Sequence, residues 1–183
     1  MDIAIRAVRA LSTLGGLCAA ALIAASVGVV CQMVVVRYVL GQTTIWQTDF
    51  VTFALVAATF LGGPYVLMTR GHVNVDVLPL HVGPRARFRL ALVASFLSLL
   101  FALVLSWLAA AFWHEAFDNN WRSDSMWRAR LWIPYLAMPV GLGLLSLQML
   151  ADLAELLTGR QHPFGIAPGT SVAEAIAVRE TGT

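Results

Sequence analysis

Four long segments without a charged residue constrain what this chain can fold into. They cover residues 10–36, 50–69, 90–113 and 131–151. An α-helix needs about 20 apolar residues to cross the roughly 30 Å of hydrocarbon in a bilayer, so each segment is long enough for one crossing. Only 12% of the 183 residues are charged, against about 25% in soluble domains. The sequence therefore predicts an all-α integral membrane protein with four transmembrane helices.

The first of these segments is too long for a cleaved signal peptide, whose apolar region has about 7–15 residues. We expect residues 1–9 to form a short N-terminus, residues 10–157 to form the four-helix membrane domain, and residues 158–183 to form a polar tail. Arg70 marks the end of the second helix, because charge is tolerated at the level of the lipid headgroups. The alternating polar and apolar residues up to Asp76 predict an interfacial segment, either helical or extended.

The arginine residues predict the orientation, because cytoplasmic loops of membrane proteins are enriched in basic residues. Seven arginines lie close to the membrane on the side that carries both termini, and four lie on the other side. Five of the six tryptophans also lie on that other side, where their rings suit the membrane interface. We therefore expect both termini in the cytoplasm and the tryptophan-rich loops outside.

The distribution of chemically active residues argues against catalysis and against transport by this chain alone. No charged residue lies inside the four segments, although intramembrane charges usually mark an ion or substrate path. All four histidines lie at or beyond the segment ends, whereas haem ligands in a helical bundle lie within facing helices. No metal-ligand spacing occurs, and the scattered arginines give no sign of nucleic-acid binding. We expect no enzyme activity, no cofactor and no metal site in this chain.

Arg37 and Asp49 bracket the connection between the first two predicted helices. The two side chains could form an ion pair that fixes this hairpin. Alternatively, Arg37 could extend to the lipid phosphates. The sequence leaves both possibilities open.

Small residues and prolines predict where the helices bend and approach each other. Pro64 removes a backbone hydrogen bond from the second helix, so we expect a kink or local widening there. Gly62 and Gly63 precede it, and Gly141 and Gly143 lie in the fourth segment. Glycine allows a neighbouring helix to approach closely. These four glycines are therefore candidates for helix contacts.

Several of these motifs, taken in order, resemble the small membrane subunit (the Q-type permease) of tripartite ATP-independent periplasmic transporters, the TRAP family. The matching residues are Arg37-Tyr38-Val39, Trp46, Asp49, Phe60-Leu61-Gly62, Arg70-Gly71-His72-Val73, Val75-Asp76, Trp132-Ile133-Pro134, Pro139 and Gly141. The resemblance covers roughly residues 10–155. The chain departs from the family at Thr48, where a second acidic residue is usual, and at Thr52, where a basic residue is frequent. The network between the first two helices is therefore expected to be thinner here.

The resemblance implies a non-catalytic subunit of a secondary, ion-coupled transporter for organic acids in the bacterial inner membrane. In this family a large multi-helix permease holds the substrate and sodium sites, and a periplasmic binding protein delivers the substrate. The small subunit is a scaffold that anchors the static part of the large permease, and it also contacts membrane lipid. Subunit-interface or structural roles are implied for Arg37, Trp46, Asp49, Gly62, Gly63, Arg70, His72, Asp76, Pro134, Pro139 and Gly141.

The loop between residues 119 and 132 has the composition of a protein interface, because Trp and Arg dominate interface energetics. We expect it to contact the periplasmic binding protein through Trp121, Arg122, Trp127, Arg128 and Arg130. Two other functions fit four charge-free helices. One is a membrane anchor for haem or quinone in a redox enzyme, and the other is a stand-alone membrane adaptor.

Overall fold

The computed structural model describes residues 2–69 and 84–158. Its elements are α1 (Asp2–Tyr38), α2 (Gln47–Met68), α4 (Pro84–Asp118), α5 (Trp132–Tyr135) and α6 (Ala137–Leu157). Residues 70–83 and the tail from residue 159 lie outside the described part. Arg70, His72 and Asp76, and the predicted interfacial segment to which they belong, therefore lie outside the described residues.

Four helical segments are long and apolar enough to cross a membrane: α1, α2, α4, and α5 together with α6. This confirms the predicted all-α fold with four membrane helices. Each of the four extends beyond its charge-free segment at one end or at both. At 1.5 Å per residue, the 37 residues of α1 measure about 55 Å, well over the roughly 30 Å of hydrocarbon. Charged residues such as Arg6 and Arg9 do not end a helix. A helix forms its backbone hydrogen bonds internally, so it can continue from the hydrocarbon into water.

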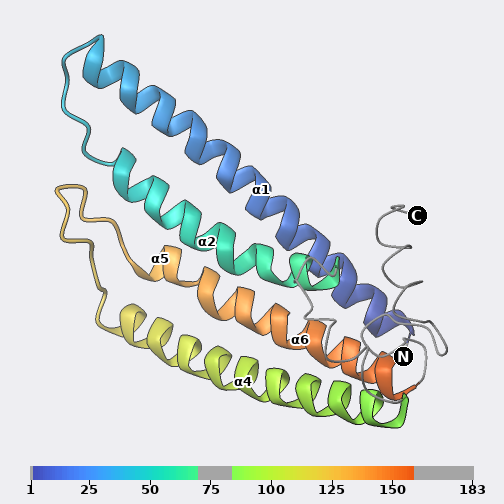
Figure 1. The fold of residues 1–183 in the computed structure, drawn as a ribbon. Coiled ribbons are helices and arrows are strands. Elements are labelled where there is room, and N and C mark those ends of the chain that lie inside the picture. Colours follow the sequence, from blue (N-terminus) through green and yellow to red (C-terminus); the bar gives the residue numbers. More distant parts are fainter. Residues whose placement is uncertain (1, 70–83, 159–183) are drawn as a thin grey trace, which may run out of the picture.

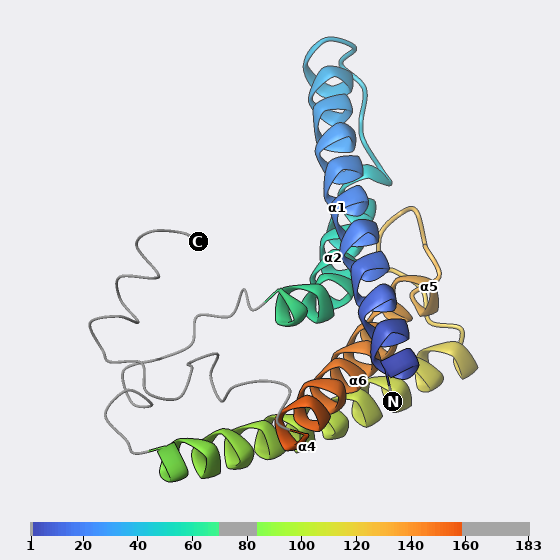
Figure 2. The ribbon, with the colours of Figure 1, turned by 90° about the vertical axis from the view of Figure 1, so that its right-hand side faces the viewer.

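The helices lie side by side, with the connection 39–46 and the loop 119–131 at one end, which we call the loop end (Figure 1). The start of α1, the start of α4 and the end of α6 lie at the opposite end. α6 contacts α1, α2 and α4, whereas α1 packs mainly on α2. Figure 2 shows the α1–α2 pair inclined to the α4–α6 pair. α6 is therefore the element that joins the two pairs.

Small side chains fill the contacts between the helices. The buried apolar residues are mostly alanines, and the largest fully buried side chains in the described part are Gln148, Pro64 and Ser12. Large apolar side chains point outward instead, and Trp107 on α4 is 77% exposed. This is the inverse of a soluble core, and it is typical of membrane helices, which associate through close backbone packing.

Two prolines shape the helices that carry these contacts. Pro139 cannot donate a hydrogen bond to the carbonyl of Tyr135, four residues earlier, and α5 ends at Tyr135 for that reason. Pro64 likewise leaves the carbonyl of Phe60 without its helical donor. α2 nevertheless continues unbroken through Pro64. The helix axis bends there, so that its last turns are tilted from the preceding ones (Figure 2).

Candidate functional site

The loop between α4 and α5, residues 119–131, has an ordered backbone, and we call it the Trp/Arg loop. Arg122 and Arg130 form an antiparallel bridge. The amide of Leu131 donates to the carbonyl of Trp121 at 3.0 Å, which extends this pairing. Arg128 has a left-handed backbone with φ of 50°, and left-handed residues are typical of tight turns. The loop is therefore a hairpin whose two arms are joined by backbone pairing, and not an irregular connection.

Asp49 fastens this loop to the start of α2. Its Oδ2 atom accepts a hydrogen bond from the hydroxyl of Ser123 at 3.0 Å and a second one from the hydroxyl of Ser125. A carboxylate in the first turn of a helix is also stabilised by the helix dipole. Asp49 thus links two connections at the loop end that are more than 70 residues apart in sequence.

The ion pair between Arg37 and Asp49, which the sequence left open, is not among the salt bridges of the described residues. Arg37 lies in the last turn of α1 and is exposed. Ser123 and Ser125 were not predicted as partners of Asp49, because neutral hydroxyls leave no charge pattern to match.

Aromatic rings gather at the loop end and hold the Trp/Arg loop against the helices. Trp46, just before α2, contacts the rings of Phe50 and Trp127 at centroid distances of 6.1 and 6.4 Å. Trp121 meets Phe112 of α4 at 5.6 Å. The further ring pairs are Phe112–Tyr135, Trp113–Phe117 and Phe117–Trp132. Trp121 and Trp127 therefore have structural partners within the chain, whatever else they contact.

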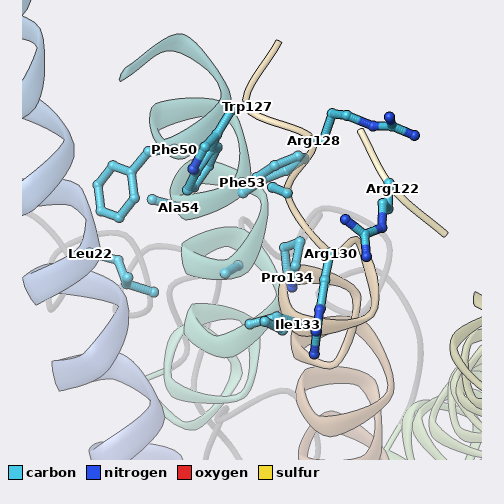
Figure 3. A pocket seen from close by; sticks show the side chains of 12 residues that line it. Leu22, Phe50, Phe53, Ala54, Arg122, Trp127, Arg128, Arg130, Ile133 and Pro134 are labelled. Atoms are coloured by element: carbon cyan, nitrogen blue, oxygen red, sulfur yellow. The ribbon is translucent and has the colours of Figure 1, made fainter. Parts of the chain in front are cut away.

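A pocket of about 480 Å³ lies between α1, α2, α5 and the Trp/Arg loop (Figure 3). Its wall is apolar and comes from Leu22 on α1, from the first three turns of α2, and from Ile133 and Pro134 of α5. Its rim carries three arginines of the loop, Arg122, Arg128 and Arg130. None of the three forms a salt bridge within the described residues. The pocket thus combines an apolar wall with unpaired positive charge.

The predicted glycine contacts are only partly formed within the chain. A Cβ atom on Gly141 would overlap the carbonyl group of Phe60, and one on Gly62 would lie 3.4 Å from Ala19. Gly63 has no atom within 4 Å of that position, so it does not mediate a helix contact here. Pro139 lies in the first turn of α6, where the missing amide hydrogen is tolerated.

Two close contacts of α1 were not predicted from the sequence. A Cβ on Gly15 would lie 2.7 Å from the carbonyl oxygen of Leu61, and one on Gly16 would lie 2.5 Å from the ring of Tyr65. The two adjacent glycines in the first apolar segment were the available signal. They allow α1 to approach the turns of α2 around Pro64.

A second polar cluster lies at the opposite end of the bundle, between α1 and α6. Arg9 donates to both carboxylate oxygens of Glu155 at 2.7 and 2.8 Å. The hydroxyl of Ser12 donates to Oε1 of Gln148 at 3.0 Å, and Nε2 of Gln148 donates to Asp152 at 3.0 Å. Ser12, Gln148 and Glu155 are buried. This cluster fixes α1 to α6, and it was not predicted from the sequence.

The described residues show no group of three His, Cys, Asp or Glu side chains placed to hold a metal ion. The one histidine among them, His114, is exposed and pairs with Asp118 at 2.9 Å, one turn later on α4. In the two polar clusters the hydrogen bonds join separate elements: Asp49 of α2 to the Trp/Arg loop, and α1 to α6. Both clusters therefore hold parts of the chain together.

Comparison with known proteins identifies the relatives of this chain. The family model described as "Tripartite ATP-independent periplasmic transporters, DctQ component" matches residues 26–159. The chain is also 26% identical over 149 residues to the C4-dicarboxylate TRAP transporter small permease protein DctQ of Vibrio cholerae serotype O1. That alignment covers 69% of this chain and 64% of the Vibrio protein, so it spans less than two thirds of the relative.

Proposed function

The chain belongs to the DctQ component family of tripartite ATP-independent periplasmic transporters, and from this premise we propose that it is a non-catalytic scaffold for a large permease subunit. The proposed transporter takes up organic acids, in keeping with the C4-dicarboxylate in the name of the Vibrio relative. The substrate site and the coupling sodium ions belong to the large partner. No cofactor is assigned to this chain.

One observation carries the scaffold role: buried polar side chains do not line a path across the bundle. Those of the described residues cluster near the ends, at Gln47 and at Ser12, Gln148 and Glu155. Ser26 and Ser146 lie between them, and both hydroxyls bond to a carbonyl of their own helix. No charged side chain of the described residues lies within the four charge-free segments, so a substrate carboxylate would have no partner of opposite charge in the middle of the membrane, where charge is most costly.

The Trp/Arg loop supports docking of a periplasmic binding protein. Met126 at its tip is 87% exposed, and Figure 3 shows the side chain of Arg128 directed away from the pocket. Asp49 and the aromatic rings hold the loop in place, so little conformational entropy is lost when a partner binds. Arg128 and Trp127 are the residues of this loop that we assign to the binding protein first.

The orientation follows from the arginine distribution, which favours both termini in the cytoplasm and the loop end in the periplasm of the bacterial inner membrane. Labelling of single cysteines with an impermeant reagent in intact cells tests this after Cys18 and Cys31 are replaced. A cysteine at Met126 should react and one at Gln161 should not. The reverse pattern would contradict the orientation.

Reconstitution in liposomes tests the scaffold role. The full chain alone should take up no radiolabelled C4-dicarboxylate, with or without a sodium gradient and the binding protein. Addition of the large permease should restore sodium-dependent uptake. Uptake by this chain alone would show that it forms its own path. For comparison, a Soret band in the absorbance spectrum of the purified chain would favour the redox-anchor alternative.

A further inference from the structure

We propose that the pocket between α1, α2, α5 and the Trp/Arg loop binds one phospholipid. The phosphate group binds to Arg122 and Arg130, and an acyl chain lies against the apolar wall. This binding site does not depend on the scaffold role or on the compartment that the loop end faces. It requires only that the loop end lies at a membrane surface.

The apolar wall on α2 runs along the outer part of one leaflet. It extends from Phe50 to Ala57, seven residues apart, which is about 10 Å at 1.5 Å per residue. Half of the roughly 30 Å hydrocarbon thickness is about 15 Å, so an acyl chain can cover this wall while its headgroup stays at the rim. Trp127 also lines the pocket and contacts the ring of Trp46, and such rings are typical of the membrane interface.

The charges at the rim call for an anion. The backbones of Arg122 and Arg130 are paired in the antiparallel bridge, and both residues line the pocket without a carboxylate partner in the described residues. Positive charges that line one pocket repel each other, and a bound anion relieves this repulsion. Guanidinium groups bind phosphate through two parallel hydrogen bonds, which makes a phospholipid headgroup a well-matched anion.

The nearby acidic groups do not neutralise this pair. The carboxylate of Asp49 accepts the hydroxyls of Ser123 and Ser125. Asp124 lines a separate cavity beside the loop, together with Arg122 and Arg128, and it forms no salt bridge in the described residues. Figure 3 shows the side chain of Arg130 running down beside Ile133, toward the apolar wall. A cation at the top of an apolar wall fits a molecule that has both an anionic and an acyl part.

A soluble organic acid or an acidic protein surface would use the arginines but leave the wall uncovered. Covering apolar surface contributes about 25 cal/mol per Å², so a ligand that reaches both parts of the pocket binds more tightly than one that reaches the rim alone. The volume of about 480 Å³ also falls within the usual range for small-molecule pockets, about 300–1,000 Å³.

Lipid retention by the full chain, purified from membranes in mild detergent with any partner that accompanies it, tests the arginines. Phospholipid that survives extensive washing is extracted and quantified by mass spectrometry. The wild type should retain one more phospholipid per chain than the Arg122→Gln/Arg130→Gln variant. The affinity for added phosphatidylglycerol should fall at least about tenfold in that variant, because both guanidinium groups that bind the phosphate are removed.

Arg6→Gln is the matched control, because Arg6 is exposed, belongs to the start of α1 at the opposite end of the bundle and does not line the pocket. It should retain lipid like the wild type. Equal lipid retention in the double variant and in the control would show that Arg122 and Arg130 do not bind lipid, and it would overturn the proposal.

A second pair of variants tests the apolar wall with the arginines intact. Ala57→Phe fills the wall and should reduce lipid retention. Ala24→Phe should not, because Ala24 is exposed, does not line the pocket and, two residues after Leu22, lies on the other side of α1. Inorganic phosphate at millimolar concentration should fail to displace the bound lipid. Full retention in Ala57→Phe, or displacement by phosphate, would show a surface anion site instead and would equally overturn the proposal. These two measurements also decide the question if the double arginine variant does not fold.

Discussion

Replacing Gly141 by alanine tests how α6 packs on α2. Pro64 leaves the Phe60 carbonyl without its helical donor, and the backbone of α6 at Gly141 lies directly against that carbonyl. A Cβ on Gly141 would come 2.5 Å from the carbonyl carbon and 2.8 Å from the Cβ of Phe60. The obstructing atoms belong to a helix backbone, which cannot rotate away as a flexible side chain would. The two helices must therefore separate.

The expected cost follows from this geometry. Overpacking a core costs about 1–3 kcal/mol, and a clash with backbone belongs near the upper end of that range. Alanine regains about 1 kcal/mol of helix propensity relative to glycine, so the net loss of stability is about 2 kcal/mol. For a chain of 183 residues this corresponds to a fall of about 4–8 °C in apparent Tm. Heating in mild detergent, followed by gel filtration of the folded fraction, measures the shift.

Gly143→Ala is the matched control on the same helix. The nearest atom to its new Cβ is the hydroxyl oxygen of Ser106 at 3.8 Å, which is ordinary van der Waals contact, so the Tm should stay the same or rise slightly. Gly63→Ala, with open space around it, should behave in the same way. If Gly141→Ala were as stable as Gly143→Ala, the close packing of α6 on α2 would be refuted.

Two further variants test the polar clusters at the two ends of the bundle. Ser12→Ala and Gln148→Leu should each lower the stability in detergent by about 1–3 kcal/mol, because each leaves a buried polar partner unbonded. The double variant should lose less stability than the sum of the two single losses. Strict additivity of the Tm shifts would show that the two side chains do not interact. Asp49→Ala should free the Trp/Arg loop and raise its rate of cleavage by trypsin roughly tenfold. This factor corresponds to the free energy of one hydrogen bond to a charged group, which would no longer oppose local opening of the loop. Thr52→Ala, which removes only a hydroxyl bonded to its own helix, should leave the cleavage rate unchanged, and equal rates in both variants would contradict the role of Asp49.

The number and the type of the membrane helices could be predicted from the sequence. Charge-free segments report directly on the bilayer, because its thickness fixes how many apolar residues a crossing needs. The gathering of Trp46, Trp121 and Trp127 at one end was predicted for a similar reason, since tryptophan prefers the interface. These features depend on the membrane as a solvent and not on which helix lies next to which.

The neighbours of each helix could not be predicted in the same way. Lipid is as apolar as leucine, so hydrophobic periodicity does not mark the face that a membrane helix turns toward another. Arg9 and Glu155, 146 residues apart, could be paired only once α6 was known to lie against α1. For the same reason Gly63 was expected at a contact and has none with the residues that the structure describes, whereas Gly15 and Gly16 form contacts that were missed.

The candidate site shows the same division. The composition of the Trp/Arg loop indicated an interface, and the arginines do line a pocket with an apolar wall. The pocket itself requires Leu22, Ala57 and Pro134 to meet from three separate elements, which no local pattern encodes. The pairing of Asp49 with two serines also depends on how the loop folds back over α2.

Affinity purification of the tagged full chain from the membranes of its own cells tests the central claim most directly. The proposed scaffold role predicts that a large multi-helix permease accompanies the chain in a fixed ratio through gel filtration in mild detergent, and that mass spectrometry identifies it. Recovery of the chain alone, or together with a haem-containing enzyme, would contradict that role.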